Sequence, residues 1–164
     1  MKRVVSLILA LCIGLIFCAC SGNKGNGRTG DTDNPKETVK ATIVDNEGNT
    51  VQMSSNELCK IHKENAANYK TKYFGAEATI SGTVEKVELG TFDTCPGYVI
   101  HLQEGWEVMV GQVEHPEVAD FSTGTKIQIS AVLEYPENGI AKMAGMLAAG
   151  DYKYRDVATI QVIK

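Results

Sequence analysis

The stretch that decides the fold covers residues 76–89 and reads AEATISGTVEKVEL. Apolar side chains alternate with polar ones through Ala78, Ile80 and Val84, which is the pattern of a strand with one buried face. The alternation then slips by one residue, as a β-bulge or a strong bend produces. Gly82, in the middle of the run, fits a strand that coils tightly. The segment therefore predicts a long, bent strand at the corner of a barrel.

Four further strand-like runs follow, and they cover residues 98–102, 106–110, 126–133 and 157–163. The first two flank the turn Glu104-Gly105 and predict a hairpin. A helical turn is predicted over residues 116–121, and an irregular stretch over residues 135–155. Five strands with a short helical element between the third and the fourth have the order of an OB-fold. The predicted fold class is mainly β (α+β), with a five-stranded OB-fold-like Greek-key barrel over residues 76–163.

The part that precedes the barrel predicts a β-hairpin and one amphipathic helix. Two β-prone runs within residues 39–53 surround a loop in which Gly48 supplies a positive φ. Ser54 and Glu57, three residues apart, form a capping box that starts a helix over residues 55–72. Apolar side chains at three- and four-residue steps give this helix one buried face. We therefore predict a single OB-fold-like domain over residues 38–164.

A helix-to-strand passage and a later strand carry a family resemblance. The residues are Glu57-Leu58, Glu64-Asn65-Ala66-Ala67, Tyr69-Lys70, Tyr73-Phe74-Gly75-Ala76, Thr79-Ile80-Ser81-Gly82-Thr83-Val84 and Gly124-Thr125-Lys126-Ile127. Together they resemble the tRNA-anti-like OB-fold family of bacterial lipoproteins, over residues 50–134. Ala131, where the family often has glycine, and a longer insertion at residues 137–155 depart from the pattern. The resemblance implies kinship with anticodon-binding barrels, without implying that this chain touches tRNA.

Residues 1–19 have the features of a lipoprotein signal peptide. A positive n-region and an apolar run that ends at Cys18 precede Ala19-Cys20, which resembles the bacterial lipobox. We therefore predict that Cys20 is lipidated, so that the domain is anchored to a membrane of the cell envelope and faces outside the cytoplasm. Phe17 departs from the leucine usual at its position. The alternative is cleavage by an ordinary signal peptidase to a freely secreted product.

The mature chain is acidic. Removing Lys2 and Arg3 with the signal from the 16 basic residues leaves 14 against 20 acidic residues, so the net charge is near −6. Residues 20–37 are dominated by Gly, Asn, Asp and Thr and predict a flexible tether, because they offer nothing to bury. Binding to nucleic acid by neutralising phosphates is disfavoured for a domain of this charge.

Two cysteines remain in the domain once Cys20 carries lipid. Either Cys59 and Cys95 form a disulfide, or they are two buried thiols that behave as small hydrophobes. Sequence spacing says nothing about the separation of their Cα atoms, so both alternatives stay open. No CxxC motif occurs, which excludes zinc ribbons and thioredoxin-like chemistry.

Aromatic side chains gather where an OB-fold binds its ligands, which is the face of the second and third strands with the loops that flank it. They are Phe92, Tyr98, Trp106, Tyr135, Tyr152 and Tyr154. Such a set would suit stacking on bases or sugars. The alternative is that the first three only plug the barrel and its ends. Acidic residues beside them, Glu104, Glu107 and Glu114, favour a protein or small ligand over a nucleic-acid strand.

Catalytic and metal-binding motifs are not apparent in the sequence. It contains no GxSxG, no HExxH and no phosphate-cradling Gly-rich loop before a helix. His62, His101 and His115 lack metal-ligand spacing, so structural or surface roles are predicted. Met143 and Met146 predict an apolar turn over the barrel end rather than a copper(I) site. We expect a binding module that is not an enzyme and needs no cofactor, with a single-stranded nucleic-acid-binding barrel as the alternative.

Overall fold

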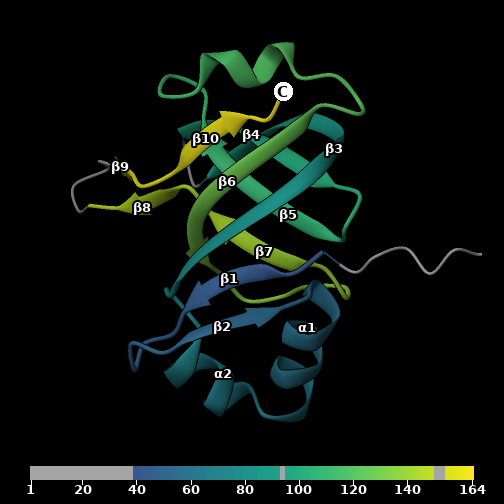
Figure 1. Ribbon diagram of the computed structural model, residues 1–164. Coiled ribbons are helices and arrows are strands. Elements are labelled where there is room, and N and C mark those ends of the chain that lie inside the picture. Colours follow the sequence, from purple (N-terminus) through teal and green to yellow (C-terminus); the bar gives the residue numbers. More distant parts are fainter. Residues whose placement is uncertain (1–38, 93–94, 150–153) are drawn as a thin grey trace, which may run out of the picture. The chain divides into compact units, whose positions relative to one another are not determined.

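Five strands close into a ring in the computed structural model, which describes residues 39–92, 95–149 and 154–164 (Figure 1). They are β3 (Glu77–Phe92), β4 (Cys95–Leu102), β5 (Trp106–Gly111), β6 (Lys126–Leu133) and β7 (Ala141–Ala144). Antiparallel pairs join β3 to β4, β4 to β5, β7 to β6 and β6 back to β3, whereas β5 and β7 are parallel. The short helix η1 (Pro116–Asp120) lies between the third and fourth strands of the ring. This is the strand order of an OB-fold, and the predicted fold class is confirmed.

Strand β3 is long enough to pair with two other strands of the ring. Residues 77–83 pair with β6, the remainder pairs with β4, and the register shifts between Val84 and Lys86. The predicted bulge therefore lies where the strand changes partner. At Gly82 a Cβ atom would lie 2.9 Å from both Leu102 Cδ1 and Glu104 Oε2, so a side chain there would have to displace these two side chains. Glycine lets β3 coil tightly enough to close the ring.

The fifth barrel strand is not the one that the sequence predicted. Strand β7 lies in the stretch that was expected to be irregular, whereas the C-terminal run forms β10 (Thr159–Val162), an additional strand that pairs with β6. Strand β7 has only four residues, which read AKMA, and alanine and lysine are poor strand formers. Pairing with β5 and β6 overrides that propensity. Strands β8 (Met146–Ala148) and β9 (Tyr154–Asp156) form a separate two-stranded arm.

The predicted hairpin lies beside the barrel. Strand β1 (Ala41–Val44) pairs with β2 (Thr50–Met53) on one edge and with β3 on the other, so the hairpin extends the barrel sheet. Gly48 has a φ of 85°, as the hairpin loop requires. Figure 1 shows the hairpin and the two long helices at one end of the barrel and η1 at the other.

The helical segment consists of two helices, where the sequence predicted one. Helix α1 (Ser55–Glu64) starts at the predicted capping box, in which Glu57 Oε2 accepts a hydrogen bond from the backbone nitrogen of Ser54 at 2.7 Å. Helix α2 (Ala66–Lys72) starts at Asn65, whose side chain accepts from the backbone nitrogen of Asn68 at 2.9 Å. Asparagine favours such a cap over a helix interior, which explains the break. Within the described ranges, no helix is long and apolar enough to cross a membrane.

The barrel interior is filled by side chains from all five strands. The largest fully buried ones include Ile80, Ile100, Trp106, Ile129 and Met143. Leu58 of α1 and Tyr69 of α2 belong to the same apolar cluster. Ser55 Oγ fixes the start of α1 to the barrel, because it donates to the carbonyl oxygen of Gly105 at 2.6 Å and accepts from the backbone nitrogen of Ala141 at 3.0 Å. The hairpin, helices and barrel therefore form one compact unit.

Candidate ligand-binding face

Strand β5 divides its side chains between the barrel interior and one outer face. Trp106, Val108 and Val110 are buried, and the residues between them, Glu107 and Met109, point the other way. Cross-strand pairing places His101 of β4 and Lys142 of β7 on either side of Glu107, and Ala144 of β7 beside Met109. We call this surface, made of His101, Glu107, Met109, Lys142 and Ala144, the β5 face.

A cleft of about 210 Å³ lies on the β5 face. Phe92 at the end of β3 and Tyr135 from the β6–β7 loop both line it. The other lining residues are Glu107, Met109, Glu134, Lys142, Met143 and Ala144. OB-folds bind oligonucleotides and oligosaccharides between these two loops and the strands beneath them. The structure thus brings two of the predicted site residues together at the position where this fold takes its ligands.

Tyr135 is held in place by other aromatic side chains, although 38% of its surface is exposed. Its ring stacks on Phe74 with 4.4 Å between centroids and lies 5.6 Å from the ring of His62. Tyr69 donates a hydrogen bond from its hydroxyl to the carbonyl oxygen of Glu134 at 2.7 Å. Burial raises the pKa of Tyr69 far above its ordinary value, so the hydroxyl stays a donor. The start of the β6–β7 loop is therefore preorganised.

A row of glycines crosses the strands near Phe92. Gly90, Gly97 and Gly111 stand opposite one another across β3, β4 and β5. A Cβ atom at Gly97 would lie 2.8 Å from the carbonyl oxygen of Val110, so no other residue fits there without a shift of backbone. The ring of Phe92 meets the ring of Tyr154 edge-on, with 5.4 Å between centroids.

A row of oppositely charged side chains crosses the β5 face, and we call this row the charge ladder. Its first half consists of Lys86, Glu88 and His101. Lys86 Nζ lies 2.8 Å from Glu88 Oε1, and His101 Nε2 lies 2.9 Å from Glu88 Oε2. The hydrogen bond from Lys86 lowers the pKa of Glu88 below its ordinary value. The same bond raises the pKa of Lys86. Lys86 therefore stays protonated and is paired with a carboxylate.

The second half of the charge ladder joins His101 to Glu107, Lys142 and Glu137. His101 Nδ1 lies 3.6 Å from Glu107 Oε2, and Lys142 Nζ lies 3.5 Å from Glu107 Oε1 and hydrogen-bonds to Glu137. The hydrogen bond from Lys142 lowers the pKa of Glu137, and that bond in turn raises the pKa of Lys142. The charge ladder contains three carboxylates and two lysines, and each lysine is paired with a carboxylate. It therefore presents a slight acidic excess around the cleft.

The other predicted aromatic residues take different places. Trp106 is only 1% exposed and plugs the barrel, so it is closed to a ligand, and its indole nitrogen has no hydrogen-bond partner in the described part of the chain. Tyr98 is half-buried and packs against the core. Tyr154 contacts Phe92 from outside the set of cleft residues. Tyr152 lies outside the described residues, and so does Cys20.

The predicted acidic rim is only partly where the sequence suggested. Glu107 lines the cleft, but Glu104 belongs to the β4–β5 turn, where its carboxylate accepts a hydrogen bond from the backbone nitrogen of Thr83 at 3.1 Å. Glu114 follows β5, and its Oε2 lies 2.1 Å from where a Cβ of Gly111 would stand. The acidic residues that replace them around the cleft are Glu134 and Glu137. Burial raises the pKa of Glu134.

Cys59 and Cys95 are not joined. Both are free, partly buried thiols: Cys59 lies on α1, whereas Cys95 opens β4 opposite Phe92. The two belong to separate elements, and the structure corresponds to the alternative without a disulfide. Burial raises the pKa of Cys59, which keeps it a thiol and makes it a poor nucleophile.

The histidines and methionines have structural contacts. His62 packs against aromatic rings, and His115 lies 3.2 Å from both Glu117 Oε1 and Asp156 Oδ1, which links η1 to β9. Met143 and Met146 are buried in β7 and β8 rather than in one apolar turn. Within the described ranges, no group of three or more His, Cys, Asp or Glu residues is placed to hold a metal ion.

Sequence reasoning missed Met109, Glu134, Lys142 and Ala144 as cleft residues. The alternation in residues 106–110 could have indicated that Met109 faces outward, because it lies on the opposite side of the strand from the large apolar Trp106. No such signal marked Lys142 and Ala144, because the strand that carries them was not recognised.

Comparison with protein-family models gave no match, and neither did comparison with curated proteins. Among solved structures, part of the chain is similar to the solution NMR structure of the replication factor A related protein from Methanobacterium thermoautotrophicum. The TM-score is 0.38 at 18% identity, over 57% of this chain and 86% of that one. The OB-fold assignment itself comes from the closed ring of strands and its order.

Proposed function

We propose that this protein is a lipid-anchored OB-fold binding module that faces outside the cytoplasm and holds a partner on its β5 face. The observation that carries the proposal is the cleft between Phe92 and Tyr135, at the site where OB-folds bind. Its volume of about 210 Å³ lies below the ~300–1,000 Å³ typical of sites that enclose a drug-sized molecule. The cleft therefore suits one anchoring side chain of a protein segment, or a very small ligand.

The chemistry of the cleft favours a partner that is both apolar and cationic. Phe92, Met109 and Tyr135 offer apolar and aromatic surface. Glu107 and Glu134 line the same cleft, and its one lysine, Lys142, is paired with Glu107 and Glu137. A protein segment with an aromatic side chain next to a lysine or arginine would match both features.

An NMR titration tests this function. The probes are two blocked tripeptides, acetyl-Lys-Phe-Lys-amide and acetyl-Glu-Phe-Glu-amide, added to the isotope-labelled domain. We expect the basic peptide to shift the amide resonances of Phe92, Met109 and Tyr135, and the acidic peptide to leave them in place. Equal shifts with both peptides, or shifts confined to residues away from the β5 face, would contradict the proposal.

Binding of single-stranded nucleic acid is the alternative function, because Phe92 and Tyr135 have the aromatic surface on which bases stack. Phosphate contacts need free cations, and both lysines of the charge ladder are paired with carboxylates. We therefore expect fluorescence anisotropy with a labelled single-stranded oligonucleotide at low salt to show no binding. Micromolar or tighter binding with a steep salt dependence would replace the proposed function with this one.

The membrane anchor is a separate part of the proposal and rests on residues 1–19 and Cys20 of the sequence. Kinship with the tRNA-anti-like OB-fold lipoproteins is proposed on the residues quoted above. We expect the mature protein to begin at Cys20, to carry lipid in intact-mass measurements and to partition into detergent. The Cys20→Ala variant should lose both the lipid and the partitioning. A mature chain that begins elsewhere without lipid would indicate free secretion.

A further inference from the structure

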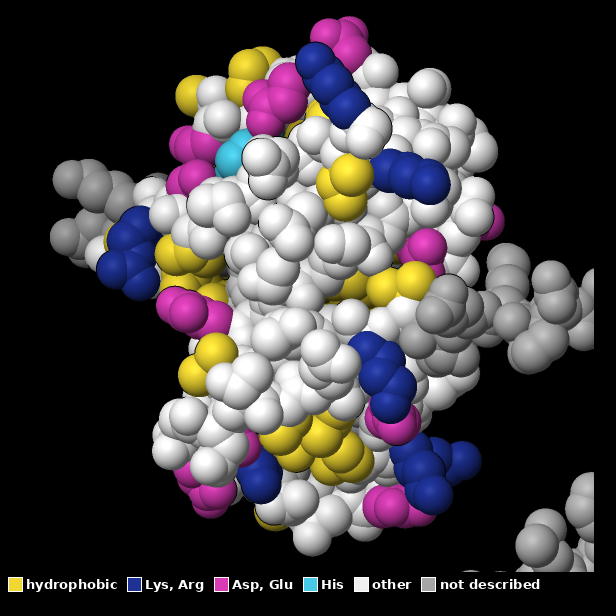
Figure 2. Space-filling model, in the orientation of Figure 1, with side chains coloured by type: hydrophobic (Ala, Val, Ile, Leu, Met, Phe, Trp, Pro, Cys, Tyr) yellow, Lys and Arg dark blue, Asp and Glu magenta, His cyan; other side chains and the backbone are white. Residues whose placement is uncertain are grey.

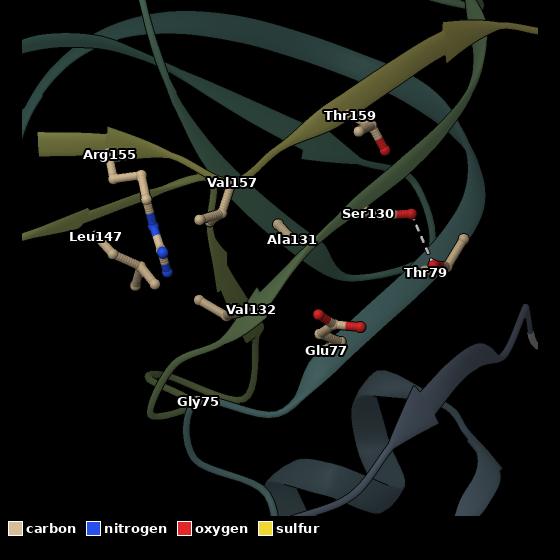
Figure 3. Close-up of a pocket in the computed structure, with 10 residues that line it drawn as sticks. All are labelled: Gly75, Glu77, Thr79, Ser130, Ala131, Val132, Leu147, Arg155, Val157 and Thr159. Carbon is tan, nitrogen blue, oxygen red and sulfur yellow. Dashed lines mark hydrogen bonds between the residues drawn. The ribbon is translucent and has the colours of Figure 1, made fainter.

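A second cavity, of about 440 Å³, lies on a different part of the barrel. Ala131 and Val132 of β6 form part of its lining, Glu77 and Thr79 line it from β3, and Arg155 lines it from the β8–β9 arm (Figure 3). It shares no lining residue with the cleft on the β5 face. This cavity is therefore separate from the cleft on the β5 face.

Opposite charges face this cavity from opposite sides. Figure 3 shows the Arg155 side chain reaching in from the arm between Leu147 and Val157, and the Glu77 carboxylate on the far side. Neither side chain forms a hydrogen bond or ion pair within the described part of the chain. On the face drawn in Figure 2, Lys and Arg side chains are scattered among Asp and Glu side chains and form no continuous basic stripe. An unpaired guanidinium and an unpaired carboxylate are thus both available to a ligand.

Uncharged groups complete the lining. Thr79 and Ser130 are joined by a hydrogen bond of 2.7 Å between their hydroxyl oxygens, and Thr159 adds a third hydroxyl. Leu147 and Val157 lie beside Arg155 and supply apolar surface. A ligand here would find ionic contacts at its two ends, hydroxyl groups on one side and a place for an aliphatic group near the guanidinium.

The arm that carries Arg155 is fixed on both sides. Arg155 pairs with Leu147 across β8 and β9. The next residue, Asp156, contacts His115 Nε2 at 3.2 Å and accepts a hydrogen bond from the backbone nitrogen of Ala158 at 3.3 Å. The guanidinium is therefore presented by a held backbone rather than by a free loop, which lowers the entropic cost of using it in binding.

We propose that this cavity binds a small zwitterion of the amino-acid type, either a free aliphatic amino acid or a dipeptide. The ligand carboxylate binds the Arg155 guanidinium, whose planar N–H donors match the two carboxylate oxygens in bidentate geometry. The ligand ammonium group binds the Glu77 carboxylate. The aliphatic side chain of the ligand packs against Leu147 and Val157. Because a single charge on the ligand would leave one wall unpaired, both charges are required. This site is independent of the function proposed for the β5 face.

Isothermal titration of the folded domain tests the site with leucine and alanyl-leucine as probes. N-acetyl-leucine, which lacks the ammonium group, and leucinamide, which lacks the carboxylate, are the matched ligands. We expect at least one zwitterion to bind, and both singly charged analogues to bind about tenfold more weakly or not at all. Absence of heat from both zwitterions into the millimolar range, or equal binding of the analogues, would overturn the proposal.

Charge-matched variants assign the two ends of the ligand. Arg155→Met should weaken zwitterion binding about tenfold and abolish the difference between leucine and leucinamide. Glu77→Gln should abolish the difference between leucine and N-acetyl-leucine. Lys126→Met on β6 and Glu85→Gln on β3 remove the same charges outside the cavity and should leave affinity unchanged. Equal losses in the control variants would show that overall charge, not this site, attracts the ligand.

Discussion

The side chains on the two sides of strand β5 differ in their surroundings. Trp106, Val108 and Val110 point inward and are buried to 1% exposure or less, whereas Glu107 and Met109 point outward and line the cleft. The inner side chains hold the barrel closed, and the outer ones are paired or half-exposed. Large aromatic side chains on an OB-fold therefore indicate binding only when their phase along the strand is known. Trp106 has the residue type of a ligand contact and the phase of a core residue.

The inner side of β5 should give the largest effect on stability. Trp106→Ala removes a fully buried indole that packs within the barrel core, and we expect a loss of about 3–5 kcal/mol in the free energy of unfolding measured with urea. Trp106→Phe should cost less, because it also removes an indole N–H that has no partner in the described structure. A loss below 1 kcal/mol for Trp106→Ala would contradict the assignment of this residue to the core.

The contact that positions the outer loop should give an intermediate effect. Tyr69→Phe removes the hydrogen bond to the carbonyl oxygen of Glu134, and we expect a loss of about 1 kcal/mol in the free energy of unfolding. Tyr73→Phe removes a hydroxyl from the next buried tyrosine, for which no hydrogen bond is found within residues 39–92, 95–149 and 154–164, and should cost about half as much or less. Equal losses in the two variants would show that the hydrogen bond to the β6–β7 loop does not contribute to the free energy of unfolding.

The charge ladder on the β5 face should give the smallest effect on stability, visible mainly in pH dependence. Lys142 lowers the pKa of Glu137, so the pair stabilises the fold above the unfolded-state pKa of about 4.3, and this contribution is lost as the pH falls through the lower folded-state pKa. In Lys142→Met, an NMR titration should show the pKa of Glu137 returning toward its ordinary value. The free energy of unfolding near neutral pH should change little, because the Glu137 side chain is exposed. An unchanged Glu137 titration would mean that the ion pair does not form in solution.

Local patterns in the sequence predicted the parts of the fold that depend on local chemistry. The slip in alternation after Val84 located the β3 bulge, and Ser54 with Glu57 located the start of α1. The sequence could not locate β7, because AKMA becomes a strand only through pairing with β5 and β6. Asn65 offered a cap inside the predicted helix, but the same residue is tolerated on an exposed helix face.

The candidate site was harder to predict than the fold, since it depends on register between strands that are distant in sequence. Phe92 and Tyr135 were identified from their loops, and the structure places both at one cleft. The charge ladder was not predicted, because it needs the alignment of β3, β4, β5 and β7 to bring Glu88, His101, Glu107 and Lys142 into contact.

The affinity of acetyl-Lys-Phe-Lys-amide for two truncation variants tests the central claim, that the outer side of β5 is the binding side. Tyr135→Ala removes a wall of the cleft, and Leu89→Ala removes an apolar side chain of 77% exposure that is not a cleft residue. We expect Tyr135→Ala to weaken binding about fivefold or more. Leu89→Ala should match the unaltered protein. Equal affinity of both variants, or a larger loss in Leu89→Ala, would contradict the account.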